Sequence, residues 1–232
     1  MIEKMLELAF GKLWPTVAAT AKDAQILFQS NTSFLELMKI RSEICARACL
    51  FGVVVAIGLG VLGLPALRSA GVKPSLELAG VMTLMNWFLI AIYGVCFGVA
   101  ARVLGTPRQM TVSVNTFFYL SAWLVVLKLL EMPALGARFS AIAQSCTLDG
   151  YETAVHAAIR GNQMAYNSDW FVVIGYLGFA FLITRMQKTL HDFGWTRAVS
   201  AMLLGMVFLA LVAGYVQGPI ISQLICSYGR DL

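Results

Sequence analysis

Residues 78–123 read LAGVMTLMNWFLIAIYGVCFGVAARVLGTPRQMTVSVNTFFYLSAW, two apolar runs separated by one short polar interruption. The bilayer core is about 30 Å thick, and a helix needs roughly 20 apolar residues to cross it. Both runs reach that length, the second by continuing to residue 130, and neither alternates polar with apolar residues as a barrel strand does. The stretch therefore predicts two membrane-spanning helices joined by a tight corner.

The composition of the whole chain supports the same interpretation. Its 232 residues are 59% hydrophobic and 12% charged, with a mean hydropathy of +0.77. A soluble domain carries about 25% charged residues. We expect an all-α polytopic membrane helical bundle with five transmembrane helices. The predicted spans are about 49–67, 78–103, 110–130, 170–184 and 198–216.

The segments around these spans complete the expected domain organisation. Residues 1–47 are predicted to be cytoplasmic, and residues 48–226 to form the transmembrane domain, followed by a short tail over 227–232. Residues 131–169 are expected to form one long outer loop, with a short helix from about Tyr151. Gly218 and Pro219 are expected to break the helix after the fifth span.

The N-terminal region carries two helix signals. In residues 1–14, apolar and charged side chains occupy opposite faces, the spacing of an amphipathic helix that lies in the membrane interface. Ser33 and Glu36 have the spacing of a capping box, which predicts a second helix that begins there and runs toward the bilayer. The charged N-terminus has no signal-peptide pattern, so no cleavable leader is expected.

The basic residues predict an orientation. With the N-terminus inside, eleven of the 17 Lys and Arg residues fall on the cytoplasmic side and six on the other. The positive-inside rule therefore favours a cytoplasmic N-terminus and an outer, periplasmic or lumenal, C-terminus. The pI near 9.0 fits this topology and attraction to anionic membrane lipids. The scattered basic residues predict no nucleic-acid partner.

Two short basic corners join successive spans. In the first, Gly105 suits the left-handed position after a helix, while Thr106 and Gln109 have the spacing of a capping box for the third span. In the second, Gly194 is expected to end the fourth span and Thr196 to cap the fifth. The basic residues of these corners, predicted to be cytoplasmic, are Arg102, Arg108, Arg185, Lys188 and Arg197.

The five cysteines divide by predicted topology. Cys146 in the outer loop and Cys226 in the tail are the two that fall on the oxidising side, so they are a candidate disulfide, although sequence does not give the distance between them. Cys45 and Cys49 share a helix face, as a metal pair would. The two histidines are predicted on opposite sides, however, so no zinc site and no other metal or cofactor is expected.

Polar residues inside the spans are the remaining candidates for chemistry. Asn86 in the second span and Asn115 in the third could bond between helices or line a conduit. Hydrolase, metalloprotease and phosphate-loop motifs are absent from the sequence, so no catalytic residue is predicted.

Residues 34–216 resemble the Yip family of five-span membrane proteins. The resemblance rests on RVLGTPRQMTVSVNTFFYLSAW (102–123), with its basic-glycine corner and a tyrosine in the following helix, and on RMQKTLHDFGWTRAVSAML (185–203). Eukaryotic members act in vesicle traffic and bind Rab GTPases. The resemblance implies an organising or adaptor role and brings no catalytic residue with it.

These observations leave three functional hypotheses. The first is a non-enzymatic integral membrane scaffold or adaptor that organises membrane lipids or protein partners, further copies of itself included. The second is an accessory subunit of a larger respiratory, secretion or transport complex. The third is a small lipid or ion conduit that uses Asn86 and Asn115.

Overall fold

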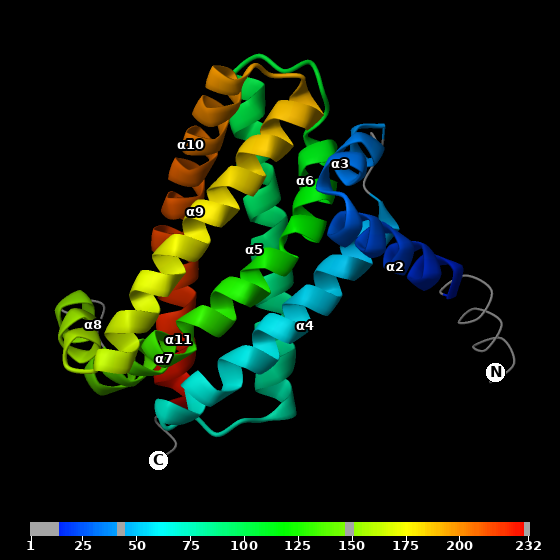
Figure 1. The fold of residues 1–232 in the computed structure, drawn as a ribbon. Coiled ribbons are helices and arrows are strands. Elements are labelled where there is room, and N and C mark those ends of the chain that lie inside the picture. Colours follow the sequence, from blue (N-terminus) through cyan, green and yellow to red (C-terminus); the bar gives the residue numbers. More distant parts are fainter. Residues whose placement is uncertain (1–13, 41–44, 147–150, 230–232) are drawn as a thin grey trace, which may run out of the picture. The chain divides into compact units, whose positions relative to one another are not determined.

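The computed structural model describes residues 14–40, 45–146 and 151–229, and every regular element in these ranges is a helix (Figure 1). The predicted interfacial helix over residues 1–14 lies almost entirely outside the described residues. The elements are α2 (Trp14–Gln29), α3 (Asn31–Lys39), α4 (Ala46–Ser69), α5 (Leu76–Val103), α6 (Met110–Leu120), α7 (Ala122–Ser145), α8 (Tyr151–Arg160), α9 (Gln163–His191), α10 (Trp195–Val212), a π-helical turn (Ala213–Gln217) and α11 (Gly218–Gly229).

Four stretches of the described residues are long and apolar enough to cross a membrane. They are α4, α5, α9 and the continuous run Trp195–Ser227, and α6 with α7 would make a fifth if counted as one broken span. Four of the five predicted spans lie within these stretches, whereas the predicted third span over 110–130 consists of two helices, α6 and part of α7, bent by 44° at their break. The all-α fold with several apolar helices is confirmed. By length and composition, these helices are compatible with a multi-pass membrane protein.

The short helix expected from about Tyr151 is confirmed as α8, but the rest of the outer loop expected over residues 131–169 is wrong, because most of it is helical as well. α7 continues to Ser145, α8 occupies Tyr151–Arg160, and α9 already begins at Gln163. The expected loop began where Glu131 and Pro133 interrupt the apolar run. The proline removes one N–H, but the Ala, Leu, Arg and Gln residues that follow it favour helix. Glu131 is also neutralised by ion pairs within the fold, described below.

The helix break expected at Gly218 and Pro219 is also wrong. The backbone passes from α10 through the π turn into α11, and Gly218 keeps a right-handed helical conformation. Its N–H donates to the carbonyl of Ala213, five residues earlier. Pro219 is then the second residue of α11, a position where a proline's missing N–H costs little.

The helix starts of the N-terminal region differ from the predicted capping box. α3 begins at Asn31, and its N-cap is Ser30, whose side chain accepts the N–H of Ser33. Ser33 therefore supplies the donor and Ser30 the cap, three residues before the predicted position. α3 ends at Lys39, and α4 begins separately at Ala46.

The described residues divide into two compact units, and α4, α5, α9 and α10 contribute to both. The first unit contains Met1–Val54, Ile90–Ser121 and Leu182–Met206. In it α3 packs beside α6 (Figure 1), around the buried Tyr119. The ring of Tyr119 lies 5.2 Å from that of Phe34 and 4.9 Å from that of Phe51, and its hydroxyl donates to Asp23.

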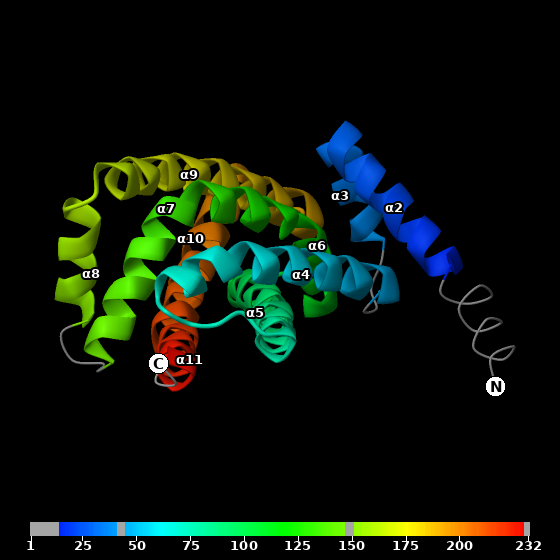
Figure 2. The ribbon, with the colours of Figure 1, turned by 90° about the horizontal axis from the view of Figure 1, so that it is seen from below.

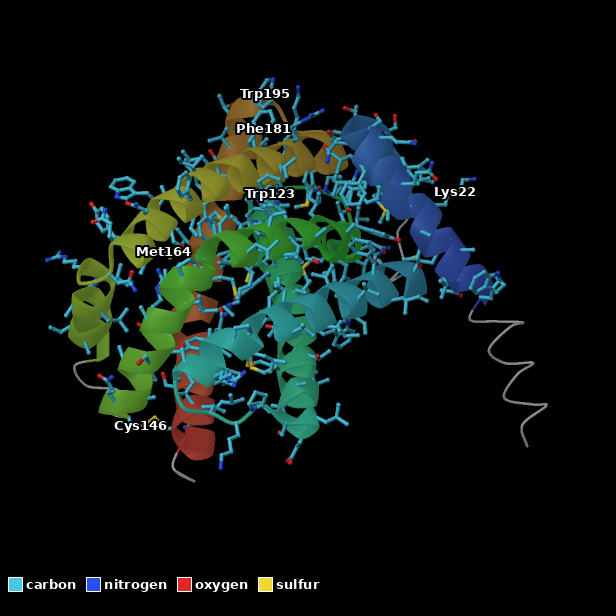
Figure 3. The ribbon with its side chains drawn as sticks, turned by 60° about the horizontal axis from the view of Figure 1, so that its bottom comes forward. Lys22, Trp123, Cys146, Met164, Phe181 and Trp195 are labelled. Carbon is cyan, nitrogen blue, oxygen red and sulfur yellow. A yellow bond between two sulfur atoms is a disulfide. The ribbon has the colours of Figure 1, made fainter. Side chains whose placement is uncertain are left out.

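The second unit contains Val55–Leu89, Ala122–Phe181 and Val207–Leu232. Its core is a cluster of buried apolar side chains from α4, α5, α7 and α11, and α8 lies beside α7 (Figure 2). Trp123 on α7 donates its indole N–H to the carbonyl of Gly175 on α9, so these two helices pack closely (Figure 3). Each unit thus has its own core and its own set of polar contacts.

Candidate functional site

In the first unit the structure brings the two predicted corners together through a buried histidine. The two ring nitrogens of His191 lie 3.1 Å from the Thr106 hydroxyl and 3.0 Å from the Ser113 hydroxyl. A neutral imidazole donates through one nitrogen and accepts through the other, so both hydroxyls have a partner. The first corner thus joins the end of α9 by side-chain hydrogen bonds.

This arrangement corrects the predicted capping box. α6 begins at Met110, and its N-cap is Gln109, which makes no side-chain capping bond. The hydroxyl of Thr106 is already used by His191 and by the N–H of Arg108, so it is not available to the helix start. Gly105 has the predicted left-handed conformation, with φ of +80°.

An ion-pair cluster, here called the Asp192 cluster, lies beside this contact. Asp192 accepts hydrogen bonds from Lys39 on α3 and from Arg108 in the first corner, and Arg108 also donates to the backbone carbonyl of Lys39. These hydrogen bonds, first from Lys39 and then from Arg108, hold the pKa of Asp192 below its ordinary value. The stabilisation is present above that ordinary value and is lost as pH falls through the lowered pKa.

Asp192 was missed in the sequence, where Gly194 was expected to end the helix. The residue that takes the left-handed conformation is Asp192, with φ of +55°, and α10 begins at Trp195, so Thr196 is not its cap. Aspartate tolerates this conformation better than most side chains do, and two cations hold it there. An aspartate directly after a basic helix end was the available signal.

Most of the other basic corner residues of the first unit make structural contacts within that unit. Arg185 donates to the hydroxyl of Thr32 at 2.6 Å, and Arg197 donates to the carbonyl of Leu104. The ammonium of Lys188 lies 4.3 Å from the Trp195 ring. Arg102 is exposed. Four of the five predicted basic residues, Arg108 included, therefore hold elements of this unit together.

The two candidate asparagines have different surroundings. Asn115 is fully buried in the first unit, and its side-chain oxygen accepts the N–H of Cys45 at 3.0 Å, which fixes the chain just before α4. Asn86 lies half-buried on α5 in the second unit. Asn115 is thus a structural bond between elements, as polar residues between membrane helices often are.

The second unit contains a pocket of about 560 Å³, here called the charged pocket. It is lined by residues of α7, α8, α9, the π turn and α11. Cavities of this volume are typical of small-molecule sites. A π turn in the wall is also characteristic of functional sites.

Four ionisable side chains in this pocket form a connected network. Arg138 donates to Glu131 and to Asp169, in each case at 2.5 Å. The Lys128 ammonium lies 3.7 Å from the other oxygen of Glu131. Two cations and two carboxylates therefore balance each other. No prediction from the sequence covered this network, and the i,i+3 spacing of Lys128 and Glu131 is the one local signal that could have indicated a pair.

Replacing Arg138 with methionine is expected to lower the free energy of unfolding by about 1–2 kcal/mol, because Asp169 loses its cation. A fully buried pair would cost about 3–5 kcal/mol to break, but these side chains are 23% to 37% exposed. Denaturation in mild detergent measures the change. Adding Asp169→Asn should recover part of the loss, and the exposed Arg160→Gln is the control. Equal stability of the Arg138 and Arg160 variants would contradict the network's role.

The predicted disulfide is present. Cys146, directly after α7, is bonded to Cys226 on α11, and their Cα atoms are 5.5 Å apart (Figure 3). Cys45, Cys49 and Cys96 are not in disulfides. Within the described ranges, no group of three or more His, Cys, Asp or Glu side chains could hold a metal ion.

Comparison with known proteins gives no information on the function. No protein-family model, curated protein or solved structure matches this chain. Functional conclusions therefore rest on the residues and their contacts.

Proposed function

We propose that this protein is a non-enzymatic integral membrane scaffold or adaptor that organises protein partners or lipids. The observation that carries the proposal is the Asp192 cluster, which fastens α3 to both basic corners of the first unit. The Arg185–Thr32 hydrogen bond adds a second attachment at the start of α3. A segment that precedes the spans is thereby held in a fixed position, as an adaptor surface has to be.

The surface of this fixed segment supports a binding role. Trp14, Val17 and Phe28 on α2 are exposed, as is Ile40 directly after α3. Exposed aromatic and aliphatic side chains beside basic residues are suited to a protein partner or to the membrane interface. The resemblance of the two corners to the Yip family implies the same organising role, and we keep that kinship as part of the proposal.

We further propose that the N-terminus is cytoplasmic and the C-terminus periplasmic or lumenal. The excess of basic residues in the N-terminal region and the corners supports this orientation. The disulfide between Cys146 and Cys226 supports it independently, because disulfides persist on the oxidising side of a membrane.

Gentle extraction of the tagged full-length protein from its native membrane, followed by mass spectrometry, tests the scaffold proposal. We expect a reproducible set of co-purifying proteins or lipids with the wild type. Asp192→Asn weakens both ion pairs and should reduce that set at least about fivefold. The exposed Arg102→Gln changes one charge in the first corner and should leave it intact.

The same experiment separates the alternatives. Unchanged recovery with a well-folded Asp192→Asn protein would contradict the role of the Asp192 cluster. Partners in fixed stoichiometry would indicate an accessory subunit of a larger complex. If the purified protein alone moved solute across liposomes, a conduit would replace the scaffold proposal. Asn86→Leu is the cleaner test of such a conduit, because Asn115 also fixes the chain before α4.

A further inference from the structure

The charged pocket of the second unit has unused hydrogen-bonding capacity. The Lys128 ammonium approaches Glu131 at 3.7 Å, which is beyond hydrogen-bonding distance. Among the residues that the structure describes, no hydrogen bond is formed by the side chains of Lys128, His156 or Tyr176, all of which line the pocket. Three groups that can donate to an anion therefore face the same space.

The acceptors are used unequally. Glu131 contacts Arg138 through one oxygen and Lys128 through the other. Asp169 uses only Oδ1, for Arg138. Within the described part of the chain its Oδ2 has no donor, so one carboxylate oxygen remains for a cationic group.

The charge balance of the pocket restricts the net charge of a ligand that can bind there. Lys128 and Arg138 together cancel Glu131 and Asp169, so a ligand with a net charge would leave an uncompensated charge in a partly buried site. A molecule that carries one anionic and one cationic group adds no net charge. It can place its anion on Lys128 and its cation on Asp169.

Apolar side chains form the rest of the wall. Leu135, Phe139 and Ile142 come from α7, Val155 and Ile159 from α8, and Ile221 from α11. A ligand with only polar groups would leave this surface without a partner. An amphiphile would cover it with its apolar part.

We propose that the charged pocket binds an amphiphilic zwitterion that carries an oxyanion and a primary ammonium group, the chemistry of a phosphoethanolamine headgroup. Lys128 pairs with the oxyanion, Tyr176 and His156 donate to it, and Asp169 Oδ2 accepts from the ammonium. A quaternary ammonium has no N–H and cannot make the last contact. This site is independent of the Asp192 cluster, and the inference does not rest on the scaffold proposal.

Binding to the full-length chain in detergent tests the proposal, with native mass spectrometry and thermal shift as readouts. The probes are phosphatidylethanolamine, phosphatidylcholine, phosphatidylglycerol and the soluble glycerophosphoethanolamine. We expect phosphatidylethanolamine to bind at least about fivefold more tightly than either of the other two lipids. Lys128→Met should weaken it about tenfold, the value of one charge-assisted hydrogen bond. Tyr176→Phe removes only a hydroxyl and should weaken it by a smaller factor.

The control variant is Arg160→Gln, which changes an exposed charge at the end of α8. Equal binding by the Lys128 and Arg160 variants would overturn the site. Equal or tighter binding of phosphatidylglycerol would overturn the zwitterion and indicate a plain anion site. If glycerophosphoethanolamine binds as tightly as the lipid, the zwitterion holds and its source is a soluble molecule. If Lys128→Met does not fold, Tyr176→Phe decides between these outcomes.

Discussion

Loss of the Cys146–Cys226 disulfide is expected to lower the free energy of unfolding by about 2–4 kcal/mol. The bond joins residues 80 positions apart in the sequence, so it removes much of the conformational freedom of the unfolded chain. It also ties the end of α7 to α11, and both helices line the charged pocket. Thermal or denaturant unfolding of Cys146→Ser in mild detergent measures the effect.

The structure provides controls for this prediction. Cys49→Ser replaces a half-buried cysteine that is not in a disulfide and should lower the free energy of unfolding less than Cys146→Ser does. Cys146→Ser combined with Cys226→Ser should be no less stable than either single variant, because all three lack the same bond. In the wild type, both cysteines should resist alkylation until a reductant is added. Full labelling without reductant would contradict the bond.

The second large effect is expected at Gly52 on α4. A Cβ atom at this position would lie 2.1 Å from the ring of Phe118, far inside van der Waals contact. Phe118 is buried on α6, so its ring has little space to move away. We expect Gly52→Ala to lower the free energy of unfolding by about 1–3 kcal/mol through overpacking.

Gly58 on the same helix is the matched control. A Cβ atom there meets no atom within 4 Å, so Gly58→Ala should be neutral or slightly stabilising, because alanine favours helix over glycine by about 1 kcal/mol. The two variants carry the same chemical change in one helix and differ in what the methyl group meets. Comparable melting temperatures for both would show that the close contact of α4 with α6 contributes little.

The main helices could be predicted because hydropathy is a local property of the sequence. The apolar runs within α4 and α5 are longer than those of helices in soluble proteins. Gly105 has the left-handed conformation that its position after a helix predicts. The disulfide could be proposed because topology placed two cysteines on one side. Long helical stretches with a proline or a charge were harder to predict, since α7 tolerates Pro133 and neutralises Glu131 only through its partners.

The polar sites could not be predicted, because their residues are far apart in the sequence. Lys39 and Asp192 are separated by 153 positions, and Thr106 and His191 by 85. Thr106, for example, was predicted to be part of a capping box, a role that needs no distant partner. Only the packing of the helices shows that their side chains have other partners. Local patterns thus predict helices better than they predict the contacts between them.

The π turn over Ala213–Gln217 has a consequence for how this sequence can change. A π turn holds one residue more than regular α-helix does, and each residue of an α-helix turns the chain by about 100°. Deleting one residue there would restore regular winding and leave the angular register of α11 nearly unchanged. Deleting one residue between the turn and Cys226 would instead rotate the following part of α11 by about 100° and turn Cys226 away from Cys146. Related sequences should therefore tolerate a one-residue deletion within Ala213–Gln217, but not between this turn and Cys226.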